Sequence, residues 1–275
     1  MRTFATVAVL AVLAAPAARA QSADEPSLAF TISAGLSTGQ KLWNVDNQPL
    51  LAPAGAYDTV RLGRRLVPGL TASLGMSLFR SPHWGLNAEI GYFGVGSEQL
   101  CIGPAVYAND SLNLNRQGCE NANGRHAASS AIGFLVGGVH QFLDSSSAWH
   151  PYIRANAGVG LLGASFVETN SLVHGPQCAG ISPSDNICPY TILSERKKRS
   201  ATFLVSLAGG FTVNFGQGYR IRMEGRDLIM QIPRVTGPAD PTTGNIADAK
   251  LVVKHVPSFT IGLDVLLERR RTRRY

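Results

Sequence analysis

The sequence predicts an all-β protein, an eight-stranded antiparallel up-and-down transmembrane β-barrel. Three observations lead to this prediction. Eight segments alternate apolar and polar residues with a period of two, which is typical of strands with two different faces. Short and long connections alternate between these segments, and aromatic residues gather beside the short ones.

The alternation is clearest in residues 220–226, where every second residue is charged and the residues between are Ile, Met and Gly. The predicted strands are 28–39, 58–79, 84–97, 130–142, 151–168, 201–215, 219–232 and 250–268. A turn at Val67-Pro68-Gly69 would raise the count to ten. However, the apolar parity continues from Val60 to Leu78 and favours one strand there.

The lengths of the connections indicate which end of the barrel each one occupies. Residues 80–83, 143–150 and 216–218 form the short connections, and roughly 40–57, 98–129, 169–200 and 233–249 form the long ones. An even number of strands with turns at one end and loops at the other is typical of transmembrane barrels.

Aromatic rings favour the interface between membrane and water. We therefore expect a girdle at the short turns, formed by Phe79, Trp84, Phe142, Trp149, Tyr152, Phe215 and Tyr219. A sheet inside hydrocarbon must close on itself, because each unpaired backbone group there costs several kcal/mol.

Residues 1–20 have the features of a cleaved signal peptide: Arg2, an apolar run over 4–15, and Ala18-Arg19-Ala20 as the cleavage site. Residues 21–275 are then expected to form a single barrel domain with a basic C-terminal tail. No later stretch is long and apolar enough to predict a transmembrane helix. The net charge of +7 does not indicate nucleic-acid binding, because the chain is predicted to be exported.

An exported chain meets an oxidising compartment, which favours disulfide bonds. We predict the pairs Cys101–Cys119 and Cys178–Cys188, because each pair lies inside one loop-like segment. A zinc site is the alternative, but it would require closer Cys-x-x-Cys spacing.

The signal peptide, the eight alternating segments and the alternating connections resemble the small eight-stranded outer-membrane barrels of Gram-negative bacteria, of the OmpA/OmpX type. The resemblance implies a location in the cell outer membrane. The last predicted strand contains Thr260, Gly262, Val265 and Leu267, which resemble the signal by which the insertion machinery recognises a final strand. A basic stretch follows before Tyr275, which departs from the terminal-aromatic form of that signal.

A closed barrel of eight strands has room inside for side chains only. The parity of the predicted strands directs three acids and three bases inward. Isolated charges would be costly there, so we expect them to pair as an ion-pair network. The predicted network consists of Glu89, Arg154, Arg222, Glu224, Arg226 and Asp264. Asp227 has the opposite, lipid-facing parity, and would need an interfacial position, a bulge or a neighbouring cation.

Two motifs suggest chemistry but lack the required context. Residues 158–163 match the dinucleotide pattern GxGxxG, and residues 35–39 match the hydrolase pattern GxSxG, but neither precedes a predicted helix. The six histidines form no catalytic set with recognisable spacing. We therefore expect no cofactor, no metal and no enzymatic activity.

Three functions follow, in order of preference. The first is a structural or surface-interaction role, with the lumen plugged by ion pairs. The second is a narrow channel for ions or small solutes. The third is a barrel enzyme that cleaves lipid or peptide. The expected partners are outer-membrane lipid, lipopolysaccharide and, during assembly, the barrel-insertion machinery. We expect a monomer.

Overall fold

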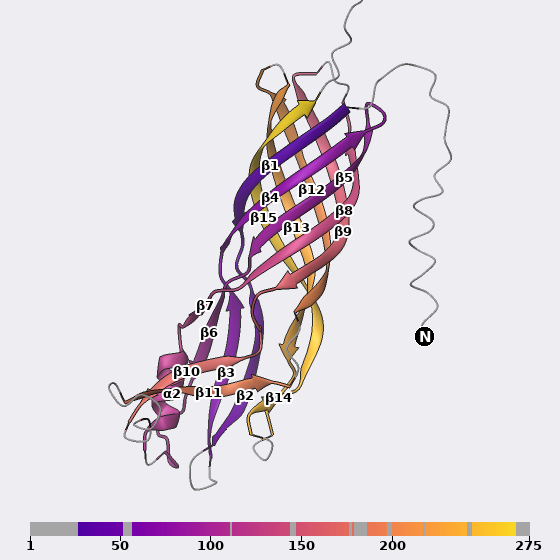
Figure 1. Ribbon diagram of the computed structural model, residues 1–275. Coiled ribbons are helices and arrows are strands. Elements are labelled where there is room, and N and C mark those ends of the chain that lie inside the picture. The colour runs from indigo at the N-terminus through magenta and orange to yellow at the C-terminus, as the bar shows by residue number, and fades with distance from the viewer. Residues whose placement is uncertain are drawn as a thin grey trace, which may run out of the picture.

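The computed structural model describes residues 27–51, 57–110, 112–143, 147–175, 178, 186–196, 200–216, 218–240 and 244–267. The predicted signal peptide and the basic C-terminal tail lie outside these residues. Eight strands form a closed barrel, and smaller sheets and a short helix extend from one end of it (Figure 1).

The barrel confirms the predicted fold class. Its strands follow the order β1-β15-β13-β12-β9-β8-β5-β4, β1 pairs with β4 to close the ring, and every pairing is antiparallel. The bounds are β1 Ser27–Ser37, β4 Gly69–Phe79, β5 Trp84–Gly94, β8 Ser130–Gln141, β9 Trp149–Leu162, β12 Ala201–Asn214, β13 Tyr219–Val235 and β15 Ala249–Leu267.

The predicted long loops contain folded structure, which we call the head. One sheet has the order β2-β3-β6-β7, formed by Lys41–Leu51, Tyr57–Leu66, Ser97–Ile102 and His126–Ala127. The other has the order β10-β11-β14, formed by Thr169–His174, Ile187–Glu195 and Ile246–Ala247. The helix α2, Leu114–Ala122, packs against β10. No helix among the described residues is long and apolar enough to cross a membrane.

The prediction of one strand over residues 58–79 is wrong. The structure has β3 in the head and β4 in the barrel, separated by Val67 and Pro68. Pro68 has no backbone N–H, and it restricts the residue before it. The interruption is two residues long, so the apolar parity is the same on both sides of the break. The barrel still has eight strands, because β3 pairs only within the head.

Two other predicted strands extend too far into the head. Segment 84–97 ends as a barrel strand at Gly94, and segment 151–168 ends at Leu162. Residues beyond these ends are apolar because they fill the core of the head; Phe166 and Val167 are fully buried there. Apolar content alone therefore does not distinguish the barrel wall from the head.

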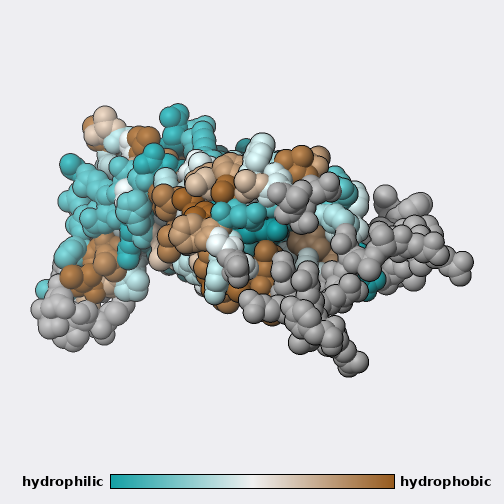
Figure 2. All heavy atoms as spheres, turned by 90° about the horizontal axis from the view of Figure 1, so that it is seen from above, coloured by the Kyte–Doolittle hydropathy of each residue, from teal (hydrophilic) through white to brown (hydrophobic). Residues whose placement is uncertain are grey.

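The barrel exposes apolar side chains on its outside. Ile32, Leu74, Ile90, Ile153 and Ile261 are each exposed by 51–60 % of their surface, although they lie in the middle of regular strands. Seen from above, brown apolar residues gather on the barrel, whereas teal residues predominate where the head projects to the left (Figure 2). The wall therefore has the inverted polarity that suits a lipid environment.

The inner wall is close-packed. A Cβ atom on Gly158 of β9 would lie 1.8 Å from the carbonyl oxygen of Phe134 on β8, and one on Gly160 would lie 2.8 Å from Leu204. These residues belong to the GxGxxG pattern, and glycine is needed there for packing inside a narrow barrel.

Candidate functional site

The candidate site is the ionic layer inside the barrel. All six predicted lumen residues are buried, with at most 5 % of their surface exposed. They come from strands around the ring: Glu89 from β5, Arg154 from β9, Arg222, Glu224 and Arg226 from β13, and Asp264 from β15. Each of the three parity-related residues on β13 directs its side chain inward because residues i, i+2 and i+4 share one face of a strand.

Four of these side chains form a closed ring of ion pairs across the lumen. Arg154 Nη1 lies 2.5 Å from Glu89 Oε2, and its Nη2 lies 2.6 Å from Glu224 Oε1. Arg226 bridges the same two acids, at 2.5 Å from Glu89 Oε1 and 2.9 Å from Glu224 Oε1. Within this ring each acid contacts the same two guanidinium groups, which links β5 and β9 to β13.

A second branch joins β13 to β15 and β1. Arg222 donates to both carboxylate oxygens of Asp264, at 2.8–3.2 Å, and its Nη1 lies 3.6 Å from Glu224 Oε2. Asp264 also accepts from the hydroxyl of Thr31 on β1, at 2.7 Å. The six charges therefore belong to one connected network.

Neutral side chains outside the predicted set of six complete the network. The Tyr152 hydroxyl donates to Glu224 Oε2 at 2.7 Å, and the Arg222 guanidinium lies 4.7 Å from the centre of the Tyr152 ring. Asn87 accepts from Arg154 at 3.2 Å and from Asn156 at 2.8 Å. The inward parity of Tyr152, Asn87 and Asn156 was visible in the sequence, but only charged residues were selected.

Burial in this layer requires balanced charge. Three acids and three bases are present, and most of their hydrogen-bonding atoms have partners within the layer. A buried ion pair is costly to desolvate, and removing one partner leaves an uncompensated charge at a cost of about 3–5 kcal/mol. The arrangement therefore favours a fixed set of partners.

Apolar layers lie above and below the ionic layer. On the side of the short turns, Phe79, Val139 and Tyr152 form a small buried cluster. On the side of the head, Leu135, Leu204, Leu228, Met230 and Val256 are buried in a core that continues into the head. Buried side chains therefore line the inside of the barrel on both sides of the ionic layer.

The predicted aromatic girdle is partly wrong. Trp84, Phe142, Trp149, Phe215 and Tyr219 are exposed at the short turns, whereas Phe79 and Tyr152 are buried. Phe79 and Tyr152 share the parity of inward-facing polar residues on their strands, so their side chains point into the lumen.

Asp227 has a hydrogen-bonding partner beside it on the outer wall. It lies on the outer wall, and its Oδ2 is 2.6 Å from Nδ1 of His255 on β15. In the paired register Asp227 lies opposite Pro257 and His255 lies opposite Ile229, so the two side chains meet diagonally. The outward-facing acid is thus hydrogen-bonded to a side chain of the neighbouring strand.

Two disulfide bonds tie the head. Cys101–Cys119 joins β6 to α2, and Cys178–Cys188 joins residue 178 to the beginning of β11. These are the two cysteine pairs predicted from the sequence. No cluster of metal-ligating side chains occurs among the residues that the structure describes.

One buried and one half-buried polar side chain bridge parts of the head. Arg64 of β3 donates to the backbone carbonyls of Ser165 and Glu168, and burial lowers its pKa to about 10. The Tyr190 hydroxyl of β11 donates to Asn115 Oδ1 of α2 at 2.6 Å, and burial raises the pKa of Tyr190 to about 12.

The four residues of the predicted assembly signal lie on β15. Thr260 is buried and faces the lumen, Gly262 and Val265 are half-buried, and Leu267 is exposed on the outer wall at the end of the strand. β15 closes the barrel between β1 and β13.

No family model matches the sequence, and no curated protein matches it. The solved structures to which the chain is similar include three outer-membrane or surface proteins. The outer membrane protein OprG from Pseudomonas aeruginosa is 10 % identical, with 88 % of this chain and 96 % of that chain covered and a TM-score of 0.44. Neisserial surface protein A is 8 % identical, with 88 % and 99 % covered and a TM-score of 0.39.

The outer membrane protein AlkL, whose structure was determined in lipid bilayers, is 12 % identical, with 94 % of this chain and 99 % of that chain covered and a TM-score of 0.37. The fold of the present chain rests on its own strand pairing, described above.

Proposed function

We propose that the protein is an integral outer-membrane barrel with a closed lumen, which presents its disulfide-tied head at the cell surface in a structural or surface-interaction role. The observation that supports this proposal is the inverted polarity of the barrel: exposed apolar side chains outside and a paired ionic layer inside. In water, such a wall would be a large exposed apolar surface.

The lengths of the strands agree with a membrane span. β1, β4 and β5 each have 11 residues. Crossing the hydrocarbon takes about 9–11 residues of a tilted strand. Five exposed aromatic side chains at the short turns mark one interface, and the head begins where the barrel strands end.

The orientation follows from the asymmetry between the two ends. In transmembrane barrels the short turns face the periplasm and the longer loops face outward. The disulfide bonds of the head are stable outside the cytosol. The predicted signal peptide supplies the export that this location needs.

The proposed partners follow from the same placement. Outer-membrane lipid and lipopolysaccharide contact the apolar wall and the region around the head. The barrel-insertion machinery recognises β15 through the residues between Thr260 and Leu267.

Two matched tags test the location. One epitope is inserted after Gly244, at a turn of the head, and the other after Gly216, at a short turn of the barrel. Exposed turns tolerate insertions well. We expect an antibody to bind intact cells carrying the first tag, and to bind the second only after the outer membrane is opened.

The same cells supply the test of insertion. A folded barrel in membrane fractions should migrate differently on a gel before and after boiling. A chain recovered from the soluble periplasm, with no heat-dependent shift, would refute the proposed function.

A further inference from the structure

The barrel wall opens at one seam near the head. β12 and β13 are paired from Asn214–Arg220 up to Leu204–Met230, and the ladder ends there. On either side the strands continue: β12 stays paired with β9 up to Ala201–Leu161, and β13 stays paired with β15 up to Val235–Ala249. The paired strands β9 and β12 therefore separate from the paired strands β13 and β15 on the head side of Leu204 and Met230.

Two residues explain why the seam opens. The Thr202 hydroxyl donates to the Gln231 carbonyl at 2.7 Å and accepts from the Gln231 N–H at 3.2 Å, so a side chain replaces backbone pairing. In an antiparallel strand, every second residue directs its N–H and C=O toward the same neighbour. After Gln231, the next residue of β13 whose backbone faces β12 is Pro233. Proline has no N–H to donate, so the backbone pairing does not resume there.

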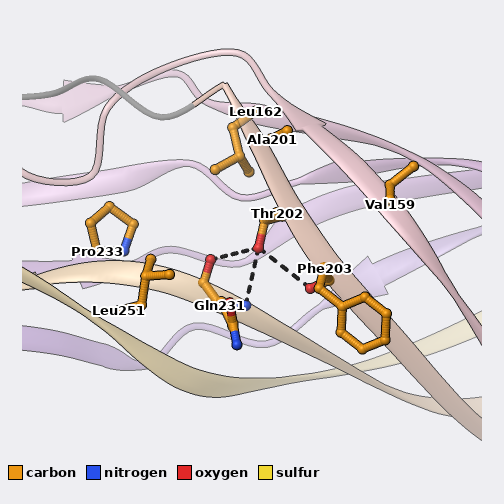
Figure 3. Close-up of a pocket in the computed structure, with 8 residues that line it drawn as sticks. All are labelled: Val159, Leu162, Ala201, Thr202, Phe203, Gln231, Pro233 and Leu251. Atoms are coloured by element: carbon orange, nitrogen blue, oxygen red, sulfur yellow. Dashed lines mark hydrogen bonds between the residues drawn. The ribbon is translucent and has the colours of Figure 1, made fainter. Parts of the chain in front are cut away.

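A cavity of about 210 Å³ occupies the seam (Figure 3). Pro233 and Leu251 lie on one side of it and Val159 and Phe203 on the other, with the Thr202–Gln231 hydrogen bonds between them. Val159, Phe203 and Leu251 are exposed on the outer wall. The cavity therefore opens toward the outside of the barrel.

The cavity ends blindly toward the inside. Leu204, Met230 and Ile232, next to the seam, have at most 1 % of their surface exposed and belong to the core that fills the barrel and the head. A ligand in the cavity would contact this core without passing through it.

We propose that this cavity, which we call the notch, binds one acyl chain of a lipid from the surrounding bilayer. The inference rests on the proposed function, because only a wall in a membrane is in contact with lipid. The lining is largely apolar, and the Thr202 hydroxyl is already hydrogen-bonded to the Gln231 backbone. A cavity of about 150 Å³ accepts benzene, so the notch has room for about six carbon atoms of a chain.

Filling the notch is favourable because an empty cavity leaves its lining without contacts on one side. A lipid chain is also the occupant already present at the outer wall. A protein partner could occupy the notch only by inserting a narrow apolar side chain between Phe203 and Leu251, both of which are exposed on the wall.

Photolabelling tests the proposal. The full chain is inserted into vesicles of phosphatidylglycerol and phosphatidylethanolamine that contain phosphatidylglycerol with a diazirine in one acyl chain. Labelled peptides are then mapped by mass spectrometry. We expect labelling at residues 201–203 and 231–233 to exceed labelling at residues 32–36 of β1, an ordinary part of the outer wall.

The variant Ala201→Phe fills the notch from its exposed edge, and Ala34→Phe adds the same ring to the outer wall on β1. Labelling at the notch should fall to the level of β1 in the first variant and stay unchanged in the second. If Ala201→Phe fails to insert, Ala201→Leu replaces it, and the wild-type map still decides the question.

The outcomes separate the two proposals. Even labelling of the whole wall, or enrichment that persists in the Ala201→Phe variant, overturns the notch and leaves the membrane location intact. No labelling anywhere on the wall overturns both proposals, because the barrel would then not lie in the bilayer.

Discussion

At the scale of single residues, removing one partner of a buried ion pair in the lumen should cost much of the free energy of unfolding. Arg154 contacts Glu89 and Glu224 at 2.5 and 2.6 Å, and it is almost fully buried. We expect Arg154→Met to lower the free energy of unfolding by about 3–5 kcal/mol, because it leaves both acids short of a cation. Urea titration of the chain folded in vesicles measures this loss.

The matched control is Arg61→Gln in the head. Arg61 pairs with Asp46 at 2.5 Å, but both side chains are more than half exposed. Exposed pairs contribute about 0–1 kcal/mol. Equal effects of the two substitutions would contradict the claim that the lumen pairs are buried and fixed.

A second residue-scale prediction concerns the head and has a defined pH window. Burial raises the pKa of Tyr190 to about 12, whereas tyrosine in an unfolded chain titrates near 10. The unfolded state therefore loses this proton first. The stabilisation from the neutral hydroxyl is complete below pH ~10 and is lost as the pH rises toward ~12.

Tyr190→Phe removes this contribution. Below pH ~10 the variant should be less stable by about 1–2 kcal/mol, because Asn115 loses its hydrogen bond. Each pH unit above ~10 lowers the free energy of unfolding of the wild type by about 1.4 kcal/mol relative to the variant. The difference in stability between the two should therefore change sign near pH ~11. Fluorescence of buried Trp43, with Trp84 and Trp149 replaced by Phe, reports the unfolding of the head. A pH-independent difference would contradict this assignment.

At the scale of elements, close approach of the strands depends on particular glycines. A Cβ atom at Gly158 would lie 1.8 Å from the Phe134 carbonyl oxygen, whereas one at Gly209 would lie 3.9 Å from its nearest neighbour. We expect Gly158→Ala to destabilise the barrel by about 1–3 kcal/mol through overpacking. Gly209→Ala should have little effect. The folded fraction on unboiled gels over a urea series compares the two, and equal losses would speak against close packing of β8 on β9.

The barrel strands were predictable because their signal is local. Alternation with a period of two is a property of each strand, and it placed Glu89, Arg154 and the three charges of β13 on the inner face before any partner was known. The bounds of β12 and the start of β13 follow the sequence prediction within one residue.

The head was not predictable in the same way. Four of its strands, β6, β7, β10 and β14, have at most six residues, and β2 and β10 have bulges or shifts in register. The sequence does not show that β3 leaves the barrel, because Val67 and Pro68 interrupt the chain without changing its parity. The pairing of Asp227 with His255 likewise depends on the register between β13 and β15, which only the folded structure gives.

At the scale of the whole molecule, the barrel exposes apolar side chains on its outside and encloses charged side chains on its inside. The outer wall is apolar, the middle of the lumen is ionic, and buried apolar clusters lie on both sides of the ionic layer. Composition alone could not predict this division, because it depends on which face each residue occupies. It could be inferred from parity, once closure of the sheet was assumed.

From the buried ion pairs and apolar clusters inside the barrel we infer that the barrel spans the membrane without conducting. Planar bilayer recordings test it most directly, with the chain inserted at a ratio at which an open porin gives clear unit steps. Insertion is verified on the same preparation by the heat-dependent shift on a gel. We predict no steady unit conductance, because ion pairs and apolar side chains fill the lumen. Reproducible unit conductance from the inserted wild-type chain would contradict the account and would indicate a narrow channel.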